Sequence, residues 1–154
     1  MLKPTKILVP TDFSRFSVIA YRQAIDIAEQ YGAEVHVLHV VEEKVRISIY
    51  EYDMADKEIS PGSIKRFEGR MRKEAEGRMI KFMNRHPPGD KVKVVSHVVK
   101  GTPVTDILQF QKDKSIDLIV ISSLGHGALA EYFIGSVARN VLKGATCPVL
   151  LTKS

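Results

Sequence analysis

The alternation of two hydrophobic patterns along the chain most constrains its fold. Lys6 to Pro10 is a short apolar run without polar alternation, which is typical of a strand covered on both faces, and Glu34 to Val41 is a second predicted strand. Between them, from Ser14 to Tyr31, apolar residues recur at spacings of three and four, which predicts a helix with one buried face. The alternation continues in the order β-α-β-α-β-α-β-α-β. It predicts a three-layer α/β/α fold around a doubly wound, five-stranded parallel sheet.

The remaining elements follow from the same patterns. Strands are expected at Lys91 to Val99, Ile116 to Ile121 and Pro148 to Thr152, and helices at Ile64 to Arg85, from Thr102 onward and at Ser136 to Lys143. Thr102 suits the cap of its helix, and Pro103 suits the first helical position. Residues 42–63 show no clear period, so we interpret them as a long, mobile excursion within one domain that spans residues 1–154.

Composition and cysteine usage indicate the compartment. Lys and Arg number 23 against 18 for Asp and Glu, and the formal net charge of +5 suits an anionic partner without identifying it. The single cysteine, Cys147, cannot form an internal disulfide, and the N-terminal residues lack the apolar core of a signal peptide. The apolar runs are far shorter than the roughly 20 residues that span a bilayer. We therefore expect a soluble, cytoplasmic protein with no membrane partner.

The predicted helix over residues 65–85 is strongly basic. It carries eight Lys or Arg side chains against three Glu side chains. Aromatic residues for base stacking are not interleaved on its basic side, since Phe67 and Phe82 belong to the apolar stripe. We interpret the basic side as a solvated helix face and do not expect nucleic acid as a partner.

The loops at the carboxyl ends of the strands are where a ligand is expected in a doubly wound sheet. The strongest local signal there is the run from Ser122 to Gly127, which includes Ser123, Gly125 and His126 and is followed by Gly135-Ser136-Val137 at a helix start. Glycines let the backbone approach a ligand, and a helix N-terminus offers free N–H groups, so the two together suit a phosphate. The alternative is that these are ordinary turn glycines.

Two side chains near these loops are candidate ligand contacts. Asp12 follows the first strand, where its carboxylate could bind ribose hydroxyls or a cation, or else cap a helix. Of the five histidines, His126 is the one in the candidate loop, where it either contacts a ligand or is simply exposed. No histidine pair has metal-ligand spacing, since His36 and His39 face opposite sides of their strand, so the sequence identifies no metal ligands. Cys147 is expected to pack rather than react.

Four segments together resemble the universal stress protein family, and within it the nucleotide-binding members similar to universal stress protein A. They are Ile7 to Ser14, Leu38-His39-Val40, Gly101-Thr102-Pro103, and Asp117 to Thr152, the last being the most specific. The resemblance runs the length of the chain. It implies the strand order 3-2-1-4-5 and a fold like that of the adenine-nucleotide alpha hydrolases.

The resemblance also implies a site for ATP, with AMP or ADP as alternatives and with Mg²⁺ or Mn²⁺. The residues implied around adenine and ribose are Pro10, Thr11, Asp12 and Val40. The residues implied around the phosphates are Ser122, Ser123, Gly125, Gly135, Ser136 and Val137. ATP-binding members carry a glycine at the first position of this phosphate motif, where this chain has Ser122. A side chain there is expected to weaken binding if the backbone must pass close to the nucleotide.

Subunit pairing in the family uses the last strand, here Val149, Leu150 and Leu151, so the resemblance implies a homodimer. The leading hypothesis is therefore a nucleotide-responsive homodimer that acts in the stress response. No residue in the candidate site is placed as a general base or nucleophile, so we expect at most slow or partner-dependent hydrolysis.

Two alternatives stay open. One is an adaptor dimer without nucleotide binding, which acts on an unidentified protein partner through residues 42–63 and the basic helix. The other is an enzyme that hydrolyses ATP or transfers phosphate, which would need Asp12 or Glu131 as its catalytic carboxylate.

Overall fold

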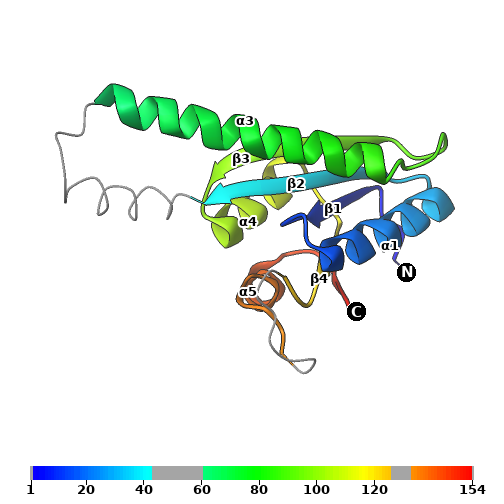
Figure 1. Cartoon of the computed structure of the whole chain (residues 1–154). Helices are drawn as coiled ribbons and strands as arrows, with labels where there is room; N and C mark the ends of the chain where they lie inside the picture. The colour runs from blue at the N-terminus through cyan, green and yellow to red at the C-terminus, as the bar shows by residue number, and fades with distance from the viewer. Residues whose placement is uncertain (1, 43–60, 126–132, 154) are drawn as a thin grey trace.

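The computed structural model of the chain, shown in Figure 1, describes residues 2–42, 61–125 and 133–153. Five parallel strands form one sheet in the order β3-β2-β1-β4-β5, which confirms the predicted doubly wound fold. The strands are β1 (Lys6–Pro10), β2 (Glu34–Glu42), β3 (Val94–Gly101), β4 (Leu118–Ser122) and β5 (Val149–Thr152). The helices are α1 (Arg15–Tyr31), α3 (Pro61–Arg85), α4 (Pro103–Asp113) and α5 (Ser136–Gly144). Within the described ranges, no helix is long and apolar enough to cross a membrane.

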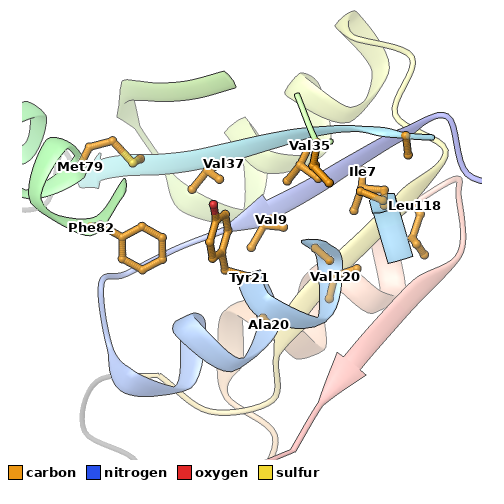
Figure 2. Close-up of a cluster of buried hydrophobic side chains, with 14 residues drawn as sticks. Ile7, Val9, Ala20, Tyr21, Val35, Val37, Met79, Phe82, Leu118 and Val120 are labelled. Carbon is orange, nitrogen blue, oxygen red and sulfur yellow. The ribbon is translucent and has the colours of Figure 1, made fainter. Parts of the chain in front are cut away.

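Two hydrophobic clusters cover the two faces of the sheet. Ile7 and Val9 of β1 face α1 and α3, whereas Leu8 faces α4 and α5. All three side chains have 0% exposure, as expected for a strand covered on both faces. Figure 2 shows the first cluster, in which the rings of Tyr21 from α1 and Phe82 from α3 lie 5.4 Å apart between centroids. β1 is therefore held from both sides, and its carboxyl end lies at the centre of the sheet edge.

Several element boundaries differ from the prediction, with the largest shifts, of three residues, at the starts of α3 and β3. Helix α3 begins at Pro61 rather than at Ile64, because a proline at a helix start needs no hydrogen-bonding N–H. Residues 61–63 of the predicted excursion over residues 42–63 therefore belong to α3, and Glu42 belongs to β2. Residues 43–60 lie outside the described part of the chain. Strand β3 begins at Val94 instead of Lys91, since residues 90 and 91 form a turn.

The helix caps are set by local hydrogen bonds. Ser14 caps α1 by accepting a hydrogen bond from the Ser17 N–H at 3.3 Å, and Gly32 ends the helix in a left-handed conformation with φ of 70°. Thr102 occupies the cap of α4 as predicted, but its hydroxyl makes no capping bond. The Asp106 carboxylate accepts from the Thr102 N–H at 2.6 Å instead.

A histidine pair, which the sequence patterns did not reveal, links β2 to β3 on the face covered by α4. His36 Nδ1 lies 3.0 Å from His97 Nε2, and the two rings are nearly parallel, at 19°. The ring of Phe110 from α4 lies edge-on to both imidazoles. His36 Nε2 is 2.9 Å from Glu34 Oε1, although the two are not aligned as a hydrogen bond. The pair therefore joins an edge strand, its neighbour and a covering helix.

We expect this pair to make folding sensitive to acid. Burial lowers the pKa of both His36 and His97 below the ordinary value of 6.5, so the folded chain binds fewer protons than the unfolded chain. The free energy of unfolding should therefore fall as the pH drops below 6.5. Urea unfolding at about pH 7.5 and about pH 5.5 measures the loss. His97→Gln should reduce it, and an equal pH dependence in both proteins would contradict this account.

Candidate functional site

The predicted site residues come from the carboxyl ends of three strands and the start of one helix. Pro10 and Ser122 end β1 and β4, Val40 lies near the end of β2, and Gly135 caps α5. β1 pairs with both β2 and β4, so these three ends share one edge of the sheet. His126 and the alternative catalytic residue Glu131 lie outside the described residues.

The turn between β1 and α1 is held by its own polar groups. The Thr11 hydroxyl accepts a hydrogen bond from the Phe13 N–H at 3.0 Å, and Asp12 Oδ1 accepts one from the Ser14 N–H at 2.9 Å. Ser14, not Asp12, is the helix cap, so the alternative role for Asp12 as a cap is wrong. Asp12 instead fixes the turn through one carboxylate oxygen.

His39 supports this turn from β2, a role that the sequence did not indicate. Its Nδ1 lies 2.8 Å from the Thr11 carbonyl oxygen, to which the Nδ1–H donates. Burial lowers the pKa of His39, and the nearby Arg78 charge lowers it further. The neutral imidazole is thus favoured, and one ring nitrogen is committed to the backbone of the predicted adenine and ribose region.

The loop after β4 forms the other half of the site. Ser122 Oγ donates to the Leu124 carbonyl oxygen at 2.5 Å and accepts from the Leu124 N–H at 3.2 Å. The Ser123 carbonyl oxygen accepts from the Gly135 N–H at 2.7 Å, which ties this loop to the start of α5. The side chain that replaces the first motif glycine is therefore turned into its own loop.

Two glycines set how closely the site backbones approach. A Cβ added to Gly125 would lie 2.7 Å from Asp12 Oδ2, so the carboxylate faces the bare backbone of the β4 loop. A Cβ added to Gly135 would lie 3.4 Å from the Ser123 carbonyl oxygen, which is close to ordinary contact. The first N–H groups of α5 have no partner within the helix and favour an anion, and Ser136 is exposed beside them.

The carboxyl ends of β1, β2 and β4 bring together one carboxylate, backbone hydrogen-bond donors and small residues. Among the described residues, no group of three or more His, Cys, Asp or Glu side chains is placed to hold a metal ion. Cys147 is half-buried against the second hydrophobic cluster, and burial raises the pKa of its thiol, in keeping with a packing role. These strand ends suit a ligand with hydroxyls at one end and negative charge at the other.

The fold is that of a doubly wound α/β domain, a class in which ligands bind at the carboxyl ends of the strands. A sequence model of the universal stress protein family matches residues 4–153, and the chain belongs to this family. Universal stress protein MJ0531 of Methanocaldococcus jannaschii is 31% identical over 148 residues, which cover 96% of this chain and 81% of the relative. MJ0577 of the same organism is 31% identical over 155 residues, which cover 96% of this chain and 94% of the relative.

Solved structures show the same architecture. The MJ0577 structure superposes with a TM-score of 0.80 at 29% identity and covers 99% of this chain and 98% of its own. A universal stress protein in complex with cAMP has a TM-score of 0.60 at 20% identity, covering 99% and 98%. The Archaeoglobus fulgidus protein in complex with dAMP has a TM-score of 0.58 at 21% identity, covering 99% and 100%. Two proteins of this fold thus bind adenine nucleotides.

Proposed function

We propose that this universal stress protein binds ATP at the carboxyl ends of β1, β2 and β4 and acts as a nucleotide-responsive homodimer in the cytoplasmic stress response. The approach of Asp12 to Gly125 is the observation that carries the proposal. It joins a carboxylate, which suits ribose hydroxyls, to a loop whose backbone is bare enough to approach phosphates. The complexes of related folds with cAMP and dAMP support an adenine nucleotide as the ligand class.

The proposed ligand positions follow the two halves of the site. Pro10, Thr11, Asp12 and Val40 would surround adenine and ribose, with Asp12 Oδ2 accepting from the ribose hydroxyls. The phosphates would lie against the β4 loop and the N-terminus of α5, held by Ser122, Ser123, Gly125, Gly135, Ser136 and Val137, with His126 as a further contact. Mg²⁺ or Mn²⁺ would neutralise part of the phosphate charge. We propose binding as the function, with at most slow or partner-dependent hydrolysis.

Titration of nucleotide-stripped protein with ATP and Mg²⁺ in a calorimeter tests this proposal. We expect a dissociation constant on the order of micromolar, and a loss of at least about tenfold in Gly135→Val. The Cβ at residue 135 is tolerated, at 3.4 Å from the Ser123 carbonyl oxygen, but the branched methyl groups should crowd the start of α5.

Gly69→Ala is the matched control for this titration. An added Cβ at Gly69, in α3, meets no atom of the described residues within 4 Å, so affinity and folding should not change. If the folded wild-type chain releases no heat with ATP, the nucleotide proposal fails and the adaptor dimer becomes the better hypothesis.

The last strand supports the proposed homodimer. Among the described strands, β5 is the last in the sheet and pairs with β4 alone, so its outer edge offers a pairing surface for a second copy. Leu150 is 38% exposed on this strand, whereas Val149 and Leu151 pack against the second cluster. An apolar edge strand of this kind is suited to a symmetric strand pair.

A further inference from the structure

Phe13 has a backbone conformation that bulky residues rarely adopt. Its φ is 63°, in the left-handed region, and Ser115 is the other non-glycine residue there among those described. Ser115 lies in the connection between α4 and β4, whereas Phe13 lies in the turn that follows β1 at the site edge. A strained residue persists only where its surroundings hold it in place, and such residues gather at functional sites.

Side chains from two other elements hold the Phe13 ring. The His39 ring, from β2, lies 4.4 Å from it between centroids at an angle of 34°. The guanidinium carbon of Arg78, from α3, lies 4.8 Å from the ring centroid. We call His39, Phe13 and Arg78 the aromatic clamp. Through it, β2 and α3 fix a residue of the turn between β1 and α1.

The backbone of Phe13 determines where Asp12 points. The Phe13 N–H donates to the Thr11 hydroxyl, and the next N–H, that of Ser14, donates to Asp12 Oδ1. His39 holds the same turn from behind through the Thr11 carbonyl oxygen. With Oδ1 engaged in this way, Oδ2 is the oxygen that faces Gly125.

We propose that Phe13 is a positioning residue for nucleotide binding, because the aromatic clamp holds it in the left-handed conformation that aims Asp12 Oδ2 at the ribose hydroxyls. This inference rests on the proposed function. The inference adds to the proposed function a residue that need not touch the nucleotide, and a link from α3 to the site. Arg78 has an exposed side chain, but it influences the geometry of the site through its contact with the Phe13 ring.

The test compares ATP with 2′,3′-dideoxy-ATP, each with Mg²⁺, in calorimetric titrations. Wild-type protein should prefer ATP by about tenfold, the value of a hydrogen bond to a charged group. Phe13→Ala should lose about tenfold in ATP affinity and little in affinity for the dideoxy nucleotide, so that the preference disappears. Asp12→Ala should remove the same preference. The double variant, with Phe13→Ala as well, should bind ATP as Asp12→Ala alone does.

Phe16→Ala is the matched control, since Phe16 also carries an arginine, Arg15, over its ring at 4.9 Å but lies outside the clamp. It should keep the preference for ATP. Equal losses for both nucleotides in Phe13→Ala would overturn the positioning role alone, whereas a wild-type chain that binds neither nucleotide would overturn the proposed function as well. If Phe13→Ala does not fold, Arg78→Met tests the clamp: a preference reduced about threefold supports it, and an unchanged preference overturns it.

Discussion

Replacing Gly125 with alanine should remove most of the ATP affinity and leave the fold intact. The added Cβ would lie 2.7 Å from Asp12 Oδ2, a separation that real side chains do not tolerate. The short Asp12 side chain can swing aside at small cost to stability, but it then loses the orientation proposed to bind ribose. We expect the dissociation constant for ATP to rise by about tenfold, since a hydrogen bond to a charged group is lost. Calorimetry and thermal unfolding measure the two effects.

Gly77→Ala provides the control for this variant. Gly77 lies within α3, where an added Cβ meets nothing within 4 Å in the described part of the chain, and alanine favours a helix over glycine. ATP affinity should not change, and stability should rise slightly. A folded Gly125→Ala chain with wild-type affinity would show that Asp12 does not act from the position that the structure gives it.

Replacing Leu150 with lysine should convert the proposed homodimer to a monomer. In a two-fold strand pair the same surface of both copies meets, so one substitution places two like charges close together. Such a juxtaposition costs several kcal/mol in an interface. Light scattering after size-exclusion chromatography should then report a mass near 17.2 kDa, that of one chain.

Ile80→Lys controls for the added charge. Ile80 is 61% exposed on α3, which packs against β2 and β3 at the other end of the sheet. This variant should keep the dimeric mass. A wild-type chain that is already monomeric, or a Leu150→Lys chain that stays dimeric, would remove the last strand from the proposed interface.

The fold was predictable from the sequence because its signals are local. The unbroken apolar run of β1 indicates burial on both faces, and Ile7, Leu8 and Val9 all prove fully buried. Gly32 directly follows the predicted helix from Ser14 to Tyr31, and it ends α1 in the left-handed conformation that glycine adopts without strain. The strand order, by contrast, came from the family resemblance, since helix and strand periods do not specify which strands are neighbours.

Features that depend on distant contacts were not predictable. His36 and His97 are 61 residues apart, and their contact follows from the β2–β3 register, which aligns Leu38 with His97. The support that His39 gives to Thr11 has the same origin, since β2 must first pair with β1. Strand and helix patterns carry no information on such registers.

The candidate site was predictable in position but less so in detail. Asp12 and Gly125 were each expected in loops that follow strands, and the structure brings the two together. The left-handed conformation of Phe13 was not expected, because a phenylalanine gives no local signal for it. The inward turn of the Ser122 hydroxyl depends on the path of its loop, which the residue type does not determine.

The outer edge of β5 has a further consequence for any dimer built on it. A two-fold axis perpendicular to the sheet would make the two copies of β5 antiparallel and continue the sheet from one subunit into the other. The carboxyl ends of the strands would then point in opposite directions in the two subunits. Two bound nucleotides would lie at opposite rims of one shared sheet, so a single flat surface could not touch both.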